Sequence, residues 1–181
     1  MSLLLGETYG IDTTALRLFN VYDSRQALSN PYTGVCAIFS SSLLNGNSPL
    51  IFEDGNQRRD FKHVDDICDV FLLSIEKPQA KNEFFNVGTG VATSINTVAE
   101  TLAKYINPSI KSIITNQFRP GDVRHCYADI SKISSKLGFK PKYSFDKGMQ
   151  ELVEWVKLQK GKAEDKSSVA KQELEQKGLL K

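Results

Sequence analysis

Segments typical of β-strands and of α-helices alternate along this 181-residue chain, and that alternation constrains its fold more than any other feature. Strands are predicted at 13–22, 83–87 and 112–117, with two short strands in 49–55 and 58–64 around an Asp54-Gly55-Asn56 turn. Apolar residues at helical spacing predict helices at 35–46, from Asp65 or Asp66 onward, and at 94–106, 129–138 and 145–159. Such alternation is typical of the α/β class.

Several of these helices carry boundary signals. Asp65 or Asp66 suits a helix start because an acidic side chain can cap it and favours the positive end of its dipole. Ser94 and Asp129 are the expected first residues of two further helices, and Gly138 is the expected stop of the second. The expected inward faces are Ile67, Val70, Phe71, Ser74 and Ile75 in the first helix, and Met149, Leu152, Val153 and Val156 in the last.

Length and composition indicate one globular domain. A chain of 181 residues can bury roughly 70% of its unfolded surface and so support a core. Hydrophobic residues make up 40% and charged residues 24%, which is ordinary for a globular protein. We expect one lobe over residues 1–159, followed over residues 160–181 by a charged, helical and partly frayed tail, because Lys, Glu, Gln and Ser dominate there.

Charge, cysteines, histidines and the first residues exclude several classes. A formal net charge of +2 with scattered basic residues does not indicate nucleic-acid binding. Cys36, Cys68 and Cys126 are too far apart to suggest a zinc site or a disulfide framework, and His63 and His125 do not suggest a metal site. The start, MSLLLGETYG, is typical of neither a signal peptide nor a membrane span, so we expect a cytoplasmic protein.

Five motifs carry a resemblance that covers the chain from about Leu16 to about Lys157. In order, they are ALRLFNVYDSRQ, SNPYTGV, PLIFEDGNQRRDFKHVDD, FFNVGTG and RPGDVRHCYADISKISSKLGF. Together they resemble the C-terminal half of extended short-chain dehydrogenases, the NAD-dependent nucleotide-sugar epimerases and dehydratases. The SNPYTGV spacing is most similar to 4-epimerases acting on UDP-glucose or UDP-N-acetylglucosamine. The resemblance implies the C-terminal portion of a Rossmann-like fold, without the N-terminal dinucleotide-binding strands.

The resemblance also implies a set of residues for the nucleotide-sugar. Arg59 and Arg119 match the arginines that bind the pyrophosphate, a role that suits a planar guanidinium able to donate two parallel hydrogen bonds. Asp122 matches the carboxylate that binds the ribose hydroxyls, and Asn20 matches the amide that donates to the phosphates. Val35 and Phe52 match positions that line the uracil.

For the cofactor, the resemblance implies NAD in the intact parent enzyme, with Phe19 facing the nicotinamide.

Simpler structural roles stand beside these assignments. Arg59 could be a surface arginine, although strand alternation puts it and Arg58 on opposite faces, so that only one can enter a site. Arg119 could belong to a plain Pro-Gly turn, and Phe19 and Phe52 could be core residues.

The family's cofactor and catalytic machinery does not fall within these motifs. Dinucleotide binding needs a glycine-rich turn after the first strand, whereas the close glycine pair here, Gly88 and Gly90, follows a later strand. The family's Tyr and Lys, four residues apart, precede the strand that holds RLFN, so the Tyr143–Lys147 spacing is interpreted as coincidental. We expect the chain to begin after that pair, to contain no catalytic residue and to bind NAD weakly if alone.

The sequence therefore predicts the UDP-sugar-binding part of an NAD-dependent 4-epimerase that is inactive by itself. Asp23 and Ser24 replace the Gly-Pro usual in the family after NVY, which leaves the sugar preference open. Alternatives are a non-enzymatic nucleotide-sugar-binding module, a remnant that binds nothing, and a 4,6-dehydratase parent. Self-association or an N-terminal cofactor-domain partner is expected because apolar surface, including Leu3, Leu4 and Leu5, would otherwise stay uncovered.

Overall fold

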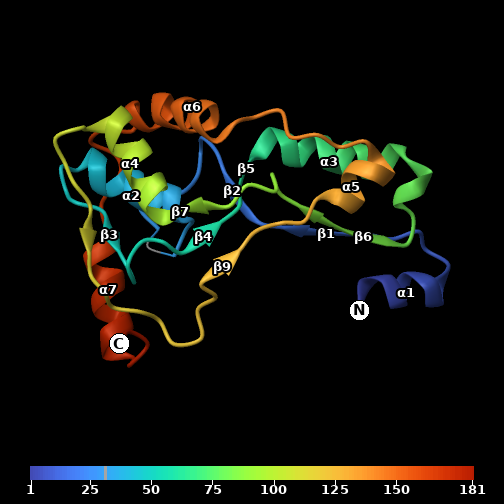
Figure 1. Cartoon of the computed structure of the whole chain (residues 1–181), viewed down its shortest axis with the longest axis horizontal. Helices are drawn as coiled ribbons and strands as arrows, with labels where there is room; N and C mark the ends of the chain where they lie inside the picture. The colour runs from blue at the N-terminus through green and yellow to red at the C-terminus, as the bar shows by residue number, and fades with distance from the viewer. Residues whose placement is uncertain (31) are drawn as a thin grey trace.

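The apolar run at 13–22 forms two consecutive strands, β1 (Thr14–Leu18) and β2 (Asn20–Tyr22), which pair with different partners. β1 runs parallel to β6 (Glu83–Val87), and β2 runs parallel to β5 (Phe61–His63). The switch falls at Phe19, because the Asn20 backbone N–H turns to the Asp60 carbonyl at 3.0 Å. This computed structural model describes residues 1–30 and 32–181, and Figure 1 shows how the two strands lead from one end of the molecule to its middle.

One end of the molecule is built on the β1–β6 pair. Helices α3 (Val64–Glu76) and α5 (Ser131–Leu137) lie on the same side of the pair (Figure 1), and the 3-10 turn η1 (Pro78–Ala80) connects α3 to β6. Alternation along β6 buries Phe85 and Val87 beneath these helices while Phe84 stays 44% exposed. We call this the sheet-end core; its buried members are Ile67, Val70, Ala80, Phe85, Val87, Ile133, Leu137 and Phe139.

The other end is a layer of helices. Helices α2 (Val35–Leu44), α4 (Ile95–Ile106) and α6 (Phe145–Lys157) pack around one apolar cluster, which we call the pocket-end core. Beside it, β3 (Leu50–Ile51) runs parallel to β8 (Ile113–Ile114). The predicted inward face of the last helix is confirmed, since Met149, Leu152, Val153 and Val156 are all buried in this core.

Short strands and one buried carboxylate join the two ends. β4 (Arg58–Arg59) lies between β7 (Thr93–Ser94), which is antiparallel to it, and β9 (His125–Cys126), which is parallel. Directly after β4, the fully buried Asp60 carboxylate accepts hydrogen bonds from the backbone N–H groups of Thr89, Gly90 and Ala128 and from the Thr89 hydroxyl. Asp60 thus ties the junction of β4 and β5 to the turn after β6.

The α/β class is confirmed, and most predicted elements form near the expected residues. Ser94 caps α4 by accepting from the Thr97 N–H at 3.1 Å. The Asp129 carboxylate accepts from the Ser131 N–H at 2.9 Å at the start of α5, although Ile130 is the cap residue. Gly138 ends α5 with a φ of 67°.

Three expectations need correction. The two short strands predicted around Asp54-Gly55-Asn56 form, but they do not pair with each other across the turn, because β3 pairs with β8 and β4 pairs with β7 and β9. Helix α3 begins at Val64, capped by the His63 ring nitrogen that accepts from the Asp65 N–H. On α3, Phe71 and Ile75 are 50% and 80% exposed rather than inward-facing.

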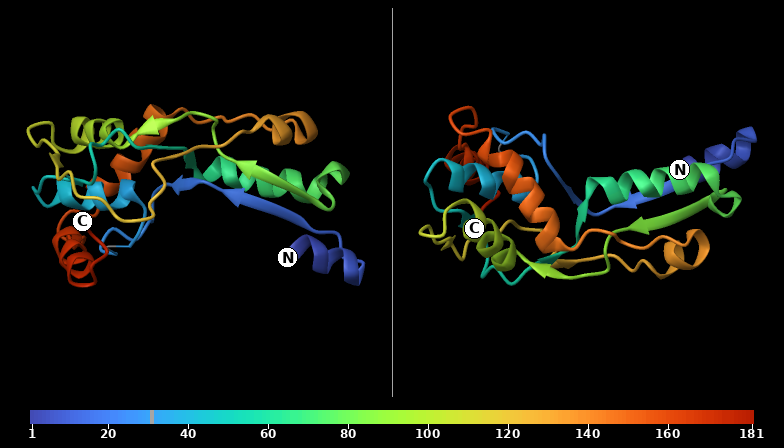
Figure 2. Two further views of the ribbon diagram at one scale, coloured as in Figure 1. Left: turned by 60° about the horizontal axis from the view of Figure 1, so that its bottom comes forward. Right: turned by 90° about the horizontal axis from the view of Figure 1, so that it is seen from above.

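The two termini add helices that lie outside these cores. Helix α1 (Ser2–Tyr9) was not predicted and lies at the sheet end, whereas α7 (Ser167–Gln176) lies beside the helical end (Figure 2). The tail is not fully solvated, because Ala170 and Leu180 are each only 9% exposed. Among the described residues, the helices lack the combination of length and apolar character that crossing a bilayer requires.

Candidate functional site

A pocket of about 370 Å³ opens between the helical end and the short strands, and its size is typical of small-molecule sites. We call it the Arg59 pocket. All six residues that the sequence analysis assigned to the nucleotide-sugar line it, together with residues of α2, β3 and α7. The six are Asn20, Val35, Phe52, Arg59, Arg119 and Asp122.

Arg59 is held rigidly at the wall of the pocket. Its Nη1 donates to the carbonyls of Arg58 and Arg124, at 2.9 and 2.8 Å, and its side chain is only 17% exposed. The remaining Nη2 lies 3.7 Å from a carboxylate oxygen of Asp122. Arg58, the neighbour on β4, is exposed and is not among the described residues lining the pocket, as strand alternation predicted.

Arg119 and Asp122 come from one loop between β8 and β9. The Asp122 N–H donates to the Arg119 carbonyl at 3.1 Å, which forms a tight turn, and Gly121 supplies the φ of 84° that this turn requires. Arg119 donates to Asp122 at 2.6 Å, so the Asp122 carboxylate lies between two guanidinium groups. The turn and the ligand role are therefore compatible, because the turn brings both side chains to the pocket.

One wall of the pocket is apolar. Val35 and Ile38 on α2, Leu50 on β3 and Phe52 directly after it lie along this wall. The Arg119 guanidinium lies 6.0 Å from the centre of the Phe52 ring. Helix α2 begins at this wall, and its N-cap Gly34 makes no side-chain capping bond, so the positive end of the helix dipole borders the pocket.

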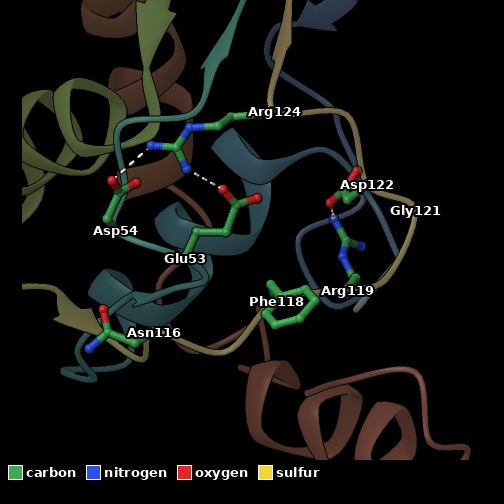
Figure 3. A pocket seen from close by; sticks show the side chains of 8 residues that line it. All are labelled: Glu53, Asp54, Asn116, Phe118, Arg119, Gly121, Asp122 and Arg124. Atoms are coloured by element: carbon green, nitrogen blue, oxygen red, sulfur yellow. Dashed lines mark hydrogen bonds and ion pairs between the residues drawn. The ribbon is translucent and has the colours of Figure 1, made fainter.

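A second, open pocket adjoins the first through shared residues. Figure 3 shows Arg124 bridging Glu53 and Asp54, with nitrogen-to-oxygen distances of 2.6 and 2.8 Å, beside the Arg119–Asp122 pair. The Arg124 guanidinium lowers the pKa of Asp54 well below its ordinary value by donating a hydrogen bond to its carboxylate. This ion-pair group fixes the segment that follows Phe52 against the segment that leads into β9.

Two predicted features lie apart from the Arg59 pocket. Phe19 is partly buried at the switch between β1 and β2 and is not among the described residues that line the pocket. Tyr143 donates to Asp65 at 2.9 Å, and this hydrogen bond raises the pKa of Tyr143 to about 12. A phenol with a raised pKa stays protonated near neutral pH and does not supply the phenolate that would abstract a proton, which favours the interpretation of the Tyr143–Lys147 spacing as coincidental.

The cluster around His63 was not predicted from the sequence. Its ring is stacked on Tyr143 with centroids 3.9 Å apart, and Asp23, His63 and Asp65 each offer a ligand-type atom within 4.8 Å of the others. His63 Nδ1 accepts from the Asp65 N–H, and its Nε2 lies 3.3 Å from Asp23. These contacts give His63 a structural role in holding the start of α3 against the loop that leads into α6.

The Gly88–Gly90 turn does not fit a dinucleotide. The N–H groups of Thr89 and Gly90 already donate to the Asp60 carboxylate at 2.8 and 2.9 Å, so they are not available to a pyrophosphate. A Cβ on Gly88 would lie 2.4 Å from an Asp60 oxygen, which explains why this position is glycine. The turn therefore serves the Asp60 contacts.

Helix α7 also contributes to the pocket, which was not predicted from the sequence. Ser167, Ala170, Lys171 and Leu174 line the Arg59 pocket, and they follow the i, i+3, i+4, i+7 spacing of one helical face. The segment SSVAKQELEQ contains this signal. Three of its ten residues are charged, Lys171, Glu173 and Glu175, and this composition made the segment resemble a solvated tail.

Comparison with known proteins places the fold and the motifs in one family. The model of the GDP-mannose 4,6-dehydratase family matches residues 3–152. The dTDP-L-rhamnose 4-epimerase of Burkholderia thailandensis is 37% identical over 141 residues, covering 78% of this chain and 39% of that protein. The UDP-glucose 4-epimerase of Mycolicibacterium smegmatis is 33% identical over 154 residues, covering 82% of this chain and 47% of that protein.

Solved structures agree. The UDP-N-acetylglucosamine 4-epimerase of Methanobrevibacter ruminantium M1, solved with UDP-N-acetylmuramic acid, is 38% identical with a TM-score of 0.80, over 87% of this chain and 51% of that one. The UDP-glucose 4-epimerase of Thermotoga maritima, solved with UDP-glucose, is 37% identical with a TM-score of 0.76, over 84% and 48%. The chain spans about half the length of the relatives it matches. It belongs to the GDP-mannose 4,6-dehydratase family, among the extended short-chain dehydrogenases that include nucleotide-sugar epimerases and dehydratases.

Proposed function

We propose that the Arg59 pocket binds the nucleotide diphosphate of a UDP-sugar, and that the chain is the substrate-binding part of an NAD-dependent nucleotide-sugar 4-epimerase. One observation carries the proposal. The six residues assigned from sequence come from β2, α2, the segment after β3, β4 and the loop before β9, yet all of them line a single pocket.

The charges of the pocket suit a diphosphate. Arg59 and Arg119 flank Asp122, so a diphosphate entering between them would take over as their partner. Asp122 would then be free to accept hydrogen bonds from the vicinal hydroxyls of the ribose. The apolar wall with Val35 and Phe52 offers a surface for the base, and the first turn of α2 adds a favourable dipole for the phosphates.

In the whole enzyme, NAD would supply the redox chemistry at the sugar carbon, while the residues of this chain hold the nucleotide and orient the sugar. Relatives of known structure include a UDP-glucuronic acid 4-epimerase from Bacillus cereus solved with NAD. The glycine turn of this chain does not fit a pyrophosphate, so we expect the chain alone to bind UDP in preference to NAD and to show no turnover. A cofactor domain or a second copy would cover its exposed apolar faces.

Titration calorimetry with UDP tests the proposal. Arg59→Ala and Arg119→Ala should each weaken binding by about five- to tenfold, because each removes charge-assisted hydrogen bonds from a partly solvated site. Arg58→Ala is the matched control on the same strand and should bind like the wild type. Equal affinity for UDP and NAD, or a larger loss with Arg58→Ala than with Arg59→Ala, would contradict the proposal.

A 4,6-dehydratase parent is the second candidate, favoured by the description of the matching family model. Product analysis by NMR of the whole protein with a UDP-sugar separates the two activities. A C4 epimer indicates the epimerase, and a 4-keto-6-deoxy sugar indicates the dehydratase.

A further inference from the structure

We propose that the C-terminal segment, residues 163–181, is part of the nucleotide-binding site, with α7 presenting Lys171 and Leu174 to a bound nucleoside diphosphate. This inference rests on the proposed function of the Arg59 pocket. The match to the GDP-mannose 4,6-dehydratase family covers residues 3–152. Helix α7, which begins at Ser167, lies outside the matched residues.

The first observation is the face that α7 turns to the pocket. Four of its residues line the pocket, and they occupy one stripe of the helix at positions 167, 170, 171 and 174. A helix that touched the pocket by chance at one end would contribute neighbouring residues, whereas a stripe along two turns shows that the helix lies along the wall.

The second observation is that the segment is fixed on both sides of α7. Before the helix, the Glu164 N–H donates to the Ser29 hydroxyl at 2.9 Å, and its carbonyl accepts from the Ser41 hydroxyl at 3.0 Å. After the helix, Lys181 and Phe118 exchange two backbone hydrogen bonds of 2.9 and 2.7 Å. Along α7 itself, Glu173 accepts from the Tyr32 hydroxyl, and Glu175 accepts from the Gln117 side chain at 3.3 Å.

These attachments reach the residues that carry the site. Phe118 directly precedes Arg119, so the backbone pairing with Lys181 holds the loop of Arg119 and Asp122. Tyr32 and Ser29 belong to the segment that leads into α2, whose first turn borders the pocket. The C-terminal segment therefore connects the two loops between which a nucleotide would bind.

The third observation is that α7 borders the pocket without filling it. A volume of about 370 Å³ remains with the helix in place, which lies within the range of small-molecule sites. Lys171, whose Nζ lies 3.7 Å from a carboxylate oxygen of Glu175 one helical turn along α7, adds a third cation beside Arg59 and Arg119, and the pocket also holds the carboxylates of Glu53 and Asp122. An additional positive charge on the wall suits a diphosphate, and Leu174 extends the apolar surface.

Two measurements test the inference. Hydrogen exchange of the wild type with and without UDP should show slower exchange in residues 167–176 when UDP is bound. In calorimetry, Lys171→Ala and Leu174→Ala should each weaken UDP binding by about fivefold, whereas Gln172→Ala, on the exposed side of the same helix, should leave it unchanged. Thermal melts of all variants establish that they remain folded.

The outcomes separate this inference from the proposed function. If UDP binds the wild type and Arg59→Ala weakens it, but α7 shows no protection and Lys171→Ala and Leu174→Ala bind like Gln172→Ala, the inference about α7 is overturned while the pocket stands. If the wild type does not bind UDP, or Arg59→Ala binds it equally well, the proposed function fails and the inference fails with it.

Discussion

At the scale of single residues, Asp60 is the polar group on which the junction of the fold depends. Its carboxylate is fully buried and accepts four donor groups from Thr89, Gly90 and Ala128. A buried carboxylate is costly unless its oxygens are hydrogen-bonded, and here the donors compensate for the lost water. The same contacts explain why Gly88 has no room for a side chain.

We expect Asp60→Asn to lower the free energy of unfolding by about 2–4 kcal/mol, because an amide nitrogen would face donors and leave buried groups unpaired. Asp12→Asn is the control, since Asp12 pairs with Lys81 where both side chains are more than half exposed. Its effect should stay below about 0.5 kcal/mol. Urea denaturation measures both, and equal losses would show that the Asp60 contacts are not important for stability.

Glu83 gives a pH dependence whose sign follows from its partners. Hydrogen bonds from Lys132 and Lys136 hold the pKa of Glu83 at about 2, below its ordinary 4.5. Because the folded pKa is lowered, the stabilisation is complete above pH 4.5 and is lost as the pH falls from about 4.5 towards 2. Denaturation at several pH values should show that acid lowers the free energy of unfolding less in Glu83→Gln than in the wild type. High salt should reduce this difference between the two proteins, because it screens the ion pairs. An unchanged acid slope in the variant would contradict this assignment.

The placement of a single residue could be predicted where its side-chain chemistry suited a ligand and its position in a strand fixed the direction in which it points. Strand alternation separated Arg59 from Arg58, and the placement of the two side chains follows it. Phe19 was assigned by resemblance to a cofactor contact, but whether it faces a nicotinamide stays a prediction. Lys171 could not be assigned, because a lysine in a polar helix gives no local sign that a distant loop will fold against it.

At the scale of elements, helix α6 shows tertiary packing overriding local preference. Gly148 lies inside this helix, where glycine is about 1 kcal/mol less favourable than alanine. A Cβ at this position would lie 2.0 Å from the Tyr22 hydroxyl oxygen and 2.9 Å from the ring carbon that bears it. Tyr22 is 3% exposed and so has little room to move. The glycine therefore allows β2 and α6 to approach.

We expect Gly148→Ala to destabilise the fold by about 1–3 kcal/mol despite its better helix propensity, because overpacking outweighs it. Glu154→Ala, at an exposed position of the same helix, should change stability by less than about 0.5 kcal/mol. In a Tyr22→Phe background, which removes the clashing oxygen, Gly148→Ala should cost less. Denaturation curves decide the matter, and a stabilising effect of Gly148→Ala alone would show that the contact relaxes freely.

The elements themselves were mostly predictable because helix periodicity and capping are local. The four inward residues of α6 and the Ser94 cap of α4 depend only on nearby sequence. Strand partners were not local: the Asp54-Gly55-Asn56 turn indicated a hairpin, but β3 and β4 find partners more than 30 residues away in β8, β7 and β9. Phe71 and Ile75 have core-like spacing, yet no described element covers them.

At the scale of the whole molecule, uncovered apolar surface lies at the sheet end. On α3, Phe71, Leu72 and Ile75 are 50%, 55% and 80% exposed, and Phe84 is 44% exposed on the far side of β6. Parallel strands of this kind are normally covered on both faces, so this end is expected to take a partner.

We expect the chain, expressed by itself, to self-associate through this end. Light scattering should show the mass rising with concentration, and the double variant Phe71→Lys and Ile75→Lys should reduce that rise. Leu158→Lys is the control, because Leu158 is 72% exposed but lies directly after α6 at the other end. A wild type that stays monomeric at all concentrations would contradict the expectation.

The elements of the two cores alternate along the chain, and this order limits when each core can form. The pocket-end core takes α2, α4 and α6, while α3 and β6 of the sheet-end core fall between α2 and α4, and α5 falls between α4 and α6. A chain emerging from the ribosome therefore cannot finish the pocket-end core before α6 has been synthesised, although α2 is made before any buried residue of the sheet-end core. The sheet-end core, whose last buried member is Phe139, can close before α6 is made, whereas the Arg59 pocket has all its walls only once α7 has been synthesised.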